Sequence, residues 1–341
     1  MRILIFFMIT CSVSAWAGLS IKSKPTKIAV MPTAGTSALA QLAASMTSGE
    51  LKTFTMGGMN MALLDSGGGH SITEFSARGH WDPVHKKIVY WGQGHYASSK
   101  LITWDDASNQ WSADNTAVFG GIGHAYYHLA LNPSNGDLYL RAYAATEVKK
   151  KPFGQAWNSI ANFSNIASQV AGGLEWFPAL NAGMGGLVFI DALGAQTWNP
   201  STNTWTTRSS NLSGLGPYHN WIATAGENLY FGGGNGSTTM YRLDKSGAVT
   251  SAPNTPLQAG VWATGLSPVI SHPDKKQLLL FSFGSTGTVH KFDGNSWSVN
   301  SSHQLNAGDW IFAVPVSDYG VVLFITQSTS VSNPVVKVYK P

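Results

Sequence analysis

The sequence predicts an all-β fold, a β-propeller of six four-stranded blades whose ring is closed by a strand near the N-terminus. Only 11% of the 341 residues are charged, against roughly 25% in an ordinary soluble domain, which does not suit helices with solvated outer faces. Tryptophans recur at a spacing near 46 residues, and the segments around them have the pattern of hairpins. At 43% hydrophobic, the chain has material for a large core, which excludes general disorder.

The N-terminal segment predicts export. Met1 and Arg2 precede an apolar run over residues 3–13, and Ala15 and Ala17 are the small residues that a signal peptidase needs. We expect a signal peptide over 1–17, a lead-in segment over 18–50 and a single propeller domain over 51–341. The mature protein would then be secreted or periplasmic.

The sequence predicts neither a membrane span nor a cysteine in the mature protein. The apolar run over 3–13 is too short to span a bilayer and no later stretch is long enough, so no membrane span is expected. Cys11, the only cysteine, leaves with the signal peptide, so the mature chain has no thiolate metal ligand and no cysteine nucleophile.

The repeat has four strands. Trp111, Trp157, Trp205 and Trp297 are separated by 46, 48 and 92 residues, and 92 is twice 46. Residues 104–111 and 198–205 both contain an aromatic residue, a polar turn and a tryptophan, and 292–297 is a shortened copy. This is the pattern of a hairpin with an aromatic at each strand end. A second hairpin lies upstream of each copy, which gives the four strands of a propeller blade.

Six such blades fit the chain. We expect them near residues 75–115, 124–163, 173–210, 217–255, 262–300 and 309–341. The last unit ends after its third strand, at 335–339, so we expect 51–56 to supply its outer strand. Residues 37–46 read as a short helix. A seventh blade built partly from residues 20–50 is the alternative.

The glycine and aromatic pattern of the blades resembles kelch repeats. Gly232, Gly233 and Gly234 follow the second strand of the fourth unit, Gly92 has the matching place in the first, and an aromatic and a tryptophan come later in the blade. The likeness covers most of residues 75–300. Kelch-like propellers include protein-binding modules, sugar mutarotases and the central domain of galactose-oxidase-like copper enzymes, and other propellers are polysaccharide lyases. The copper enzymes use a tyrosine crosslinked to cysteine, so their activity is not expected of a mature chain without cysteine.

One face of the ring is expected to hold the functional site. We call it the mouth face: the innermost strand of each blade begins there, and the loop between the second and third strands opens there. The segment 123–128 brings His124, Tyr126, Tyr127 and His128 to it. Strand alternation puts His124, Tyr126 and His128 on one side and Tyr127 on the other. Imidazole can act as a base or bind a metal near neutral pH, while structural packing is the alternative.

Further candidates lie at matching places in other blades. The segment 216–220 carries Tyr218, His219 and Asn220, and His95 follows the second strand of the first blade. Arg141 and Asp191 occupy second-strand positions where other blades have small residues, and burying a charge there is costly unless it is paired or meets a ligand. They form either a structural ion pair between neighbouring blades or part of a binding site.

The predicted function is that of a carbohydrate-active enzyme, most plausibly a lyase that cleaves an acidic polysaccharide or oligosaccharide by β-elimination. Such a reaction needs a cation for the uronate carboxylate, a base for the neighbouring proton and an acid for the leaving oxygen. Arg141 or Arg78 would neutralise the carboxylate. The base would be His124, His128 or His219 and the acid Tyr127 or Tyr218, with His95, Tyr126, Asp191 and Asn220 as further substrate contacts.

Two alternatives remain beside the lyase. A divalent metal bound by two or three of the histidines is a variant of the enzyme. A non-catalytic, kelch-like module that binds a glycan or a protein is the other hypothesis, and a mutarotase or hydrolase is a weaker one. The net charge of +4 is small and scattered, so no nucleic-acid partner is expected, and the chain is expected to act as a monomer.

Overall fold

The computed structural model describes residues 37–94, 98–114, 118–119, 124–164, 172–192, 194–260, 267–282, 287–305, 310–330 and 332–341. The predicted signal peptide, Cys11 and the candidate His95 lie outside the described residues. Among the described residues, no helix has the length and apolar character needed to cross a membrane.

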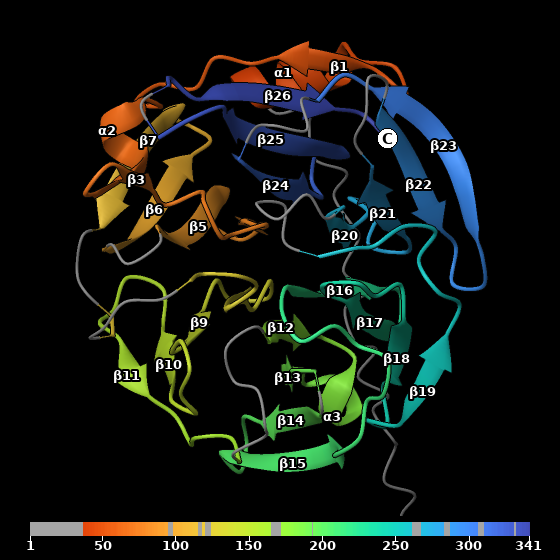
Figure 1. Ribbon diagram of the computed structural model, residues 1–341. Coiled ribbons are helices and arrows are strands. Elements are labelled where there is room, and N and C mark those ends of the chain that lie inside the picture. The colour runs from red at the N-terminus through yellow and green to blue at the C-terminus, as the bar shows by residue number, and fades with distance from the viewer. Residues whose placement is uncertain are drawn as a thin grey trace, which may run out of the picture. The chain divides into compact units, whose positions relative to one another are not determined.

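The described strands form six four-stranded antiparallel sheets arranged around a ring, so the protein is a six-bladed β-propeller as predicted (Figure 1). In each of the first five blades, strands that follow one another in the chain are neighbours in the sheet. These blades are β4 (His80–Asp82), β5 (Lys87–Gln93), β6 (Ser99–Asp105) and β7 (Gln110–Asp114); β8 (Leu129–Leu131), β9 (Leu138–Arg141), β10 (Val148–Lys151) and β11 (Asn158–Ser159); β12 (Gly173–Phe177), β13 (Gly186–Ile190), β14 (Ala195–Asn199) and β15 (Thr204–Ser209); β16 (Asn220–Ala225), β17 (Asn228–Gly233), β18 (Met240–Asp244) and β19 (Val249–Ala252); and β20 (Val269–Ser271), β21 (Leu278–Phe281), β22 (Gly287–Phe292) and β23 (Trp297–His303).

The sixth blade joins the two ends of the domain. Its strands are β24 (Trp310–Val316), β25 (Val321–Gln327), β26 (Val335–Tyr339) and, on the outside, β1 (Leu51–Thr53), which pairs antiparallel with β26. Figure 1 shows β1 along the outer side of β26. The predicted closing strand is therefore confirmed. Pairing with β1 satisfies the outer edge of β26. An unpaired strand edge at this position could form hydrogen bonds with strands of other chains.

The short elements outside the blades also follow from sequence. The predicted helix over 37–46 is α1 (Ala38–Ala44), whose first turn is capped by the Ser37 hydroxyl accepting from the Ala40 N–H. Because 37–53 form α1 and β1, the described part of this region supplies no seventh blade. The remaining elements are α2 (Met61–Leu64), the ribbon β2 (Asp65–Gly67) and β3 (His70–Ser71), and α3 (Leu180–Gly183).

The tryptophan repeat has a clear structural cause. Trp104 pairs across the hairpin with Trp111, and Trp198 pairs with Trp205 in the same way. In both turns an asparagine with φ near +53°, a backbone conformation that asparagine tolerates, accepts a hydrogen bond from the first tryptophan's indole N–H, at 3.2 Å and 3.1 Å. The spacing seen in the sequence therefore reflects a hairpin in which turn geometry and aromatic packing depend on each other.

Candidate functional site

The segment 124–128 is held in an irregular conformation beside the ring axis. It precedes β8, and short bridges join Tyr126 to Ser76 and Tyr127 to Gly173. The expectation from strand alternation takes this segment as a regular extension of β8. Tyr126 has φ +40°, so the segment does not continue β8 in that way. The predicted division of side chains is nevertheless present. The rings of His124 and His128 lie 5.1 Å and 5.4 Å from the Tyr126 ring, between centroids, while Tyr127 packs over the Arg78 guanidinium at 5.0 Å.

Tyr126 lies at the centre of a cluster drawn from two blades. The His219 ring comes within 5.2 Å of the Tyr126 ring, between centroids, and the Tyr126 hydroxyl is hydrogen-bonded to His124 Nδ1. Burial raises the pKa of Tyr126, so its hydroxyl keeps its proton at neutral pH. The structure thus brings three predicted histidines, His124, His128 and His219, around one phenol.

The environment of His219 favours a neutral ring with one available nitrogen. Its Nδ1 lies 2.8 Å from the Asn235 side-chain oxygen, an acceptor, so Nδ1 carries the proton and donates it. Desolvation lowers the pKa of His219, and the hydrogen bond that its ring donates to Asn235 opposes that effect. A neutral imidazole protonated at Nδ1 has its lone pair on Nε2. His219 can therefore accept a hydrogen bond or a proton there.

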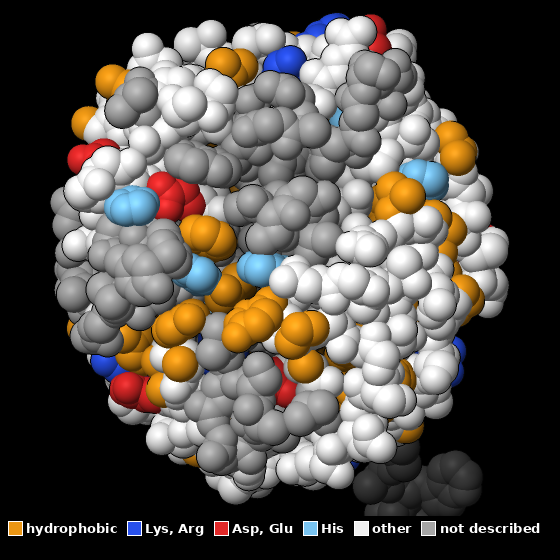
Figure 2. Space-filling view, viewed as in Figure 1, with side chains coloured by type: hydrophobic (Ala, Val, Ile, Leu, Met, Phe, Trp, Pro, Cys, Tyr) orange, Lys and Arg blue, Asp and Glu red, His pale blue; other side chains and the backbone are white. Residues whose placement is uncertain are grey.

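Aromatic side chains surround this cluster on the mouth face. Phe75 stacks on His124 with 3.9 Å between ring centroids, and Tyr143 lies 5.7 Å from the same imidazole. Tyr218 is 44% exposed, and its ring lies 6.1 Å from that of His219. Figure 2 shows hydrophobic side chains and histidines gathered near the centre of this face. We call Phe75, Tyr126, Tyr143, Tyr218 and the histidines His124 and His219 the mouth cluster.

A carboxylate–histidine pair lies on the same face. His70 Nδ1 is 3.0 Å and 3.1 Å from the two carboxylate oxygens of Glu74. Glu74 is only 5% exposed, whereas 37% of the His70 side chain is accessible. A carboxylate so placed accepts a hydrogen bond from the ring and fixes its orientation.

Asn220 has a structural position. It is fully buried, and its side-chain amide donates to the carbonyls of Gly216 and Gly233 at 3.0 Å and 3.1 Å. These bonds fix the loop that carries Tyr218 and His219 against the end of β17. Asn220 therefore acts on the cluster through the loop and does not face the mouth.

The two candidate arginines are also buried. Arg78 lies at the ring axis, 5% exposed, and forms an ion pair with Glu175. It also donates to backbone carbonyls of three other residues, Leu129, Leu174 and Ile222, at 3.5 Å, 3.3 Å and 2.8 Å. Arg78 thereby ties together the inner strands of four blades.

Arg141 and Asp191 are fully buried. Desolvation lowers the pKa of Arg141 to about 9, and the charge of Asp191 raises it against that effect, so the guanidinium stays protonated at neutral pH. It packs over the Phe189 and Phe163 rings at 5.0 Å and 5.7 Å. Both charges are enclosed by the blades, and the choice between an ion pair and a ligand contact stays a prediction.

A metal centre is not apparent in the part of the chain that the structure describes. No group of three or more His, Cys, Asp or Glu side chains there is placed to hold a metal ion. His95 lies outside the described residues, so the predicted metal on the histidines stays a prediction.

Sequence reasoning missed three contributors. Glu175 was not singled out, although a lone acidic residue inside the apolar run 173–177 was a signal of a buried ion pair. Asn235 lies in a glycine-rich loop with no pattern that marks it as the partner of His219. Lys275 lies in a turn on the opposite face and lines a cavity there.

Comparisons with known proteins identify the fold and nothing narrower. No protein-family model and no curated protein sequence matches the chain. Among solved structures it is similar to SapL1 lectin in complex with alpha methyl fucoside, with TM-score 0.54 and 14% identity over 79% of this chain and 95% of that one. It is similar to an auxiliary nutrient binding protein from Bacteroides ovatus, with TM-score 0.53 and 13% identity over 84% of this chain and 76% of that one. It is also similar to virginiamycin B lyase from Staphylococcus aureus, with TM-score 0.50 and 11% identity over 85% of this chain and 99% of that one.

Proposed function

We propose that the chain binds a carbohydrate at the mouth cluster. The observation that carries this proposal is the exposed Tyr218 ring beside the neutral His219 and the buried Tyr126. Tyrosine rings present an apolar face and a polar edge, which suits the apolar face and hydroxyl rim of a sugar. A lectin among the similar structures supports a glycan ligand for this fold.

A binding measurement tests this proposal. A glycan array followed by calorimetry with the retained oligosaccharide should give saturable binding, and Tyr218→Ala should weaken it about tenfold or more because an aromatic contact at the centre of an interface is removed. Val299→Ala is the matched control, since Val299 is also exposed, at 69%, but lies in the outer strand β23. Equal loss in both variants, or no loss in Tyr218→Ala, would contradict the assignment.

A lyase that acts by β-elimination is the second candidate, favoured by the pairing of a base with an acid. His219 Nε2 would take the proton next to the uronate carboxylate. The C–H electron pair would form the new double bond, and the bond to the glycosidic oxygen would break. The Tyr126 hydroxyl, hydrogen-bonded to His124, would donate a proton to the leaving oxygen. His219 would be left protonated and Tyr126 as a phenolate, and transfer of one proton from His219 to Tyr126 through solvent would restore both before the next turnover.

The cation for this reaction differs from the predicted one. Arg78 and Arg141 are both enclosed, so neither would meet a uronate at the mouth. A hydrogen bond from His70, whose ring is oriented by Glu74, would take the place of that cation at the substrate carboxylate. The mouth cluster itself is uncharged, and it therefore supports a neutral sugar better than an acidic one.

An activity assay separates the two candidates. A lyase would release unsaturated products that absorb in the ultraviolet from an acidic polysaccharide. Both His219→Asn and Tyr126→Phe should then abolish that release while glycan retention persists. Retention with no unsaturated product from the wild-type chain would leave the binding module as the function.

We also propose that the chain is an exported, monomeric kelch-like propeller, secreted or periplasmic. Mass spectrometry of the mature chain should find an N-terminus near Gly18, and an uncleaved Met1 would contradict export. Elemental analysis of the purified protein tests the divalent metal that the histidines were expected to bind, and a stoichiometric metal lost in His124→Ala would support it.

A further inference from the structure

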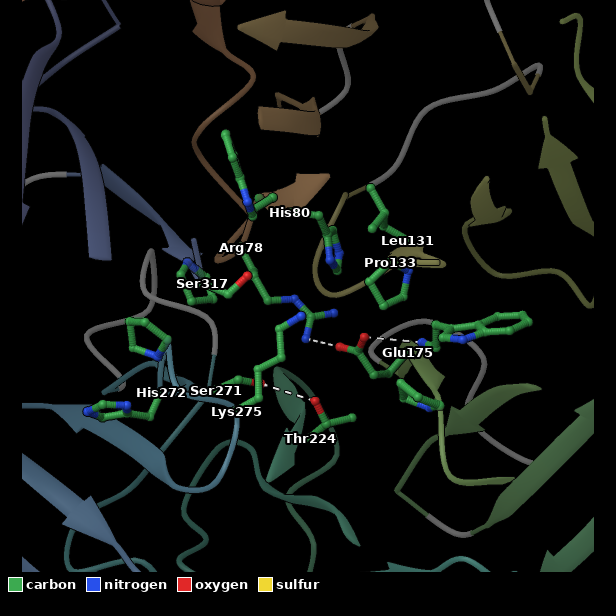
Figure 3. A pocket seen from close by; sticks show the side chains of 16 residues that line it. Arg78, His80, Leu131, Pro133, Glu175, Thr224, Ser271, His272, Lys275 and Ser317 are labelled. Atoms are coloured by element: carbon green, nitrogen blue, oxygen red, sulfur yellow. Dashed lines mark hydrogen bonds and ion pairs between the residues drawn. The ribbon is translucent and has the colours of Figure 1, made fainter. Parts of the chain in front are cut away.

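A cavity of about 110 Å³ lies at the ring axis on the face opposite the mouth. One enclosed water needs only about 10–15 Å³ by the same kind of measure, so the cavity has room for a small organic molecule. Its wall consists of the ends of the inner strands and the turns that follow them, from several blades (Figure 3). The mouth cluster contributes no residue to this wall.

The wall of the cavity carries an excess positive charge. Arg78 and Glu175 line it as an ion pair, and these two charges cancel. His80 lines it in neutral form, because burial and the neighbouring Arg78 hold its pKa well below the ordinary range. The ammonium of Lys275 is then the uncompensated charge of the lining, and Figure 3 shows this side chain reaching over the cavity.

The surroundings of Lys275 favour a counter-ion. Desolvation lowers the pKa of its amine, while the charge of Asp318 opposes that effect. Asp318 is itself hydrogen-bonded to Lys86 at 2.5 Å, and the nearby Asp274 lies 2.8 Å from His272. The acidic groups next to the cavity therefore have other partners, Lys86 for Asp318 and His272 for Asp274.

Other polar side chains line the cavity beside Lys275. Arg78 is one of them, and its side chain is 4% exposed. Its Nε–H has no hydrogen-bond partner among the described residues and is enclosed by the wall. The hydroxyls of Ser271 and Thr224, 3.4 Å apart, line the same cavity.

The rest of the wall is apolar. Four prolines, Pro133, Pro178, Pro273 and Pro315, line the cavity together with parts of Trp81 and Trp176. Rigid apolar walls around a few convergent polar groups are typical of small-molecule sites.

We propose that this cavity binds a small organic monocarboxylate, with the carboxylate at the Lys275 ammonium and the apolar part of the molecule against the prolines. A single excess positive charge matches one carboxylate, whereas a phosphate would bring more negative charge than the lining offsets. The site lies apart from the mouth cluster and does not depend on the carbohydrate proposal.

Calorimetry with matched probes tests the proposal on the full chain. Sodium butyrate should bind with a saturable heat at millimolar concentration, and butyramide, which has the same shape without the charge, should bind at least about tenfold more weakly, because hydrogen bonds to charged groups contribute about 1.5–3 kcal/mol. Lys275→Gln should weaken butyrate binding by a similar factor. Lys276→Gln is the control, since Lys276 is exposed in the same turn and does not line the cavity.

A second variant tests the cavity without changing Lys275 or any other charge. Ser317→Phe places a ring at the cavity lining without altering a charge, and it should abolish butyrate binding with little change in the melting temperature. His219→Ala should leave butyrate binding intact. Equal binding of butyramide, undiminished binding in Lys275→Gln, or no binding of butyrate by the wild-type chain would each overturn the proposal.

Discussion

Removing the charge of Glu175 is expected to be among the most damaging conservative changes in this protein. Glu175 and Arg78 form an ion pair at the ring axis with 9% and 4% of their side chains exposed. Glu175→Gln keeps the size of the side chain but leaves a buried guanidinium without its counter-charge. Breaking a buried pair from one side costs about 3–5 kcal/mol, because the remaining charge stays desolvated.

The expected loss converts into a measurable shift. Roughly 300 folded residues give an unfolding entropy of about 0.6 kcal/mol per kelvin, so the melting temperature of Glu175→Gln should fall by about 5–8 °C. Differential scanning calorimetry at neutral pH measures this directly. The size follows from burial, since an exposed pair in high dielectric would contribute little.

A surface pair provides the matched control. Glu227 lies 2.9 Å from Lys245, with 75% and 63% of their side chains exposed, and Glu227→Gln should leave the melting temperature unchanged. The double variant Arg78→Met with Glu175→Leu should lose less stability than the sum of the single variants, because no unpaired charge stays buried. A Glu175→Gln protein that melts within about 1 °C of the wild type would refute the assignment of the axial pair as a stabilising contact.

Three further outcomes are expected. Burial lowers the pKa of His303 to about 4, and its Nδ1 accepts the Leu305 N–H at 3.0 Å. The imidazole of His303 therefore binds a proton more readily in the unfolded chain than in the folded one. As the pH falls from 6.5 to 4, the free energy of unfolding should decrease by up to about 3 kcal/mol. Urea unfolding of His303→Gln should give a free energy that depends less on pH, and an unchanged pH dependence would exclude His303 as the cause. Lys52→Pro disrupts the pairing of β1 with β26 and should lower the free energy of unfolding by about 1–3 kcal/mol. Urea unfolding measures this loss against Lys52→Ala, and equal midpoints for the two variants would contradict the role of the closing strand. Gly234 has φ +93°, and an added Cβ would lie 2.7 Å from Asn220 Nδ2, so Gly234→Ala should cost about 1–3 kcal/mol and weaken glycan binding through the 216–220 loop; unchanged binding by calorimetry would show that the loop is not coupled to the site.

The fold was predictable because its signals are local and repeated. The hairpins around Trp104 and Trp198 depend on residues within one turn, and they recur along the chain. The closing strand followed from a count of strands in the last blade, which left one outer position to fill.

The site was predictable only in part. The sequence placed His124, Tyr126 and His219 on one face because propeller topology brings the start of every inner strand to that face. It did not show that the Tyr126 ring lies among three histidines, since that contact joins two blades and depends on positive φ angles at Tyr126 and His219.

The sequence by itself determined an all-β ring of six blades, its closing strand and the segments that reach the mouth face, because strand period, turn residues and blade spacing are properties of neighbouring residues. The tertiary structure alone decided what the charged groups do. Arg78 meets Glu175 across 97 positions of sequence, and Lys275 reaches an axial cavity formed by several blades. Whether a charge is paired, buried or available to a ligand depends on burial and distance, and both are set by the packing of blades around the axis.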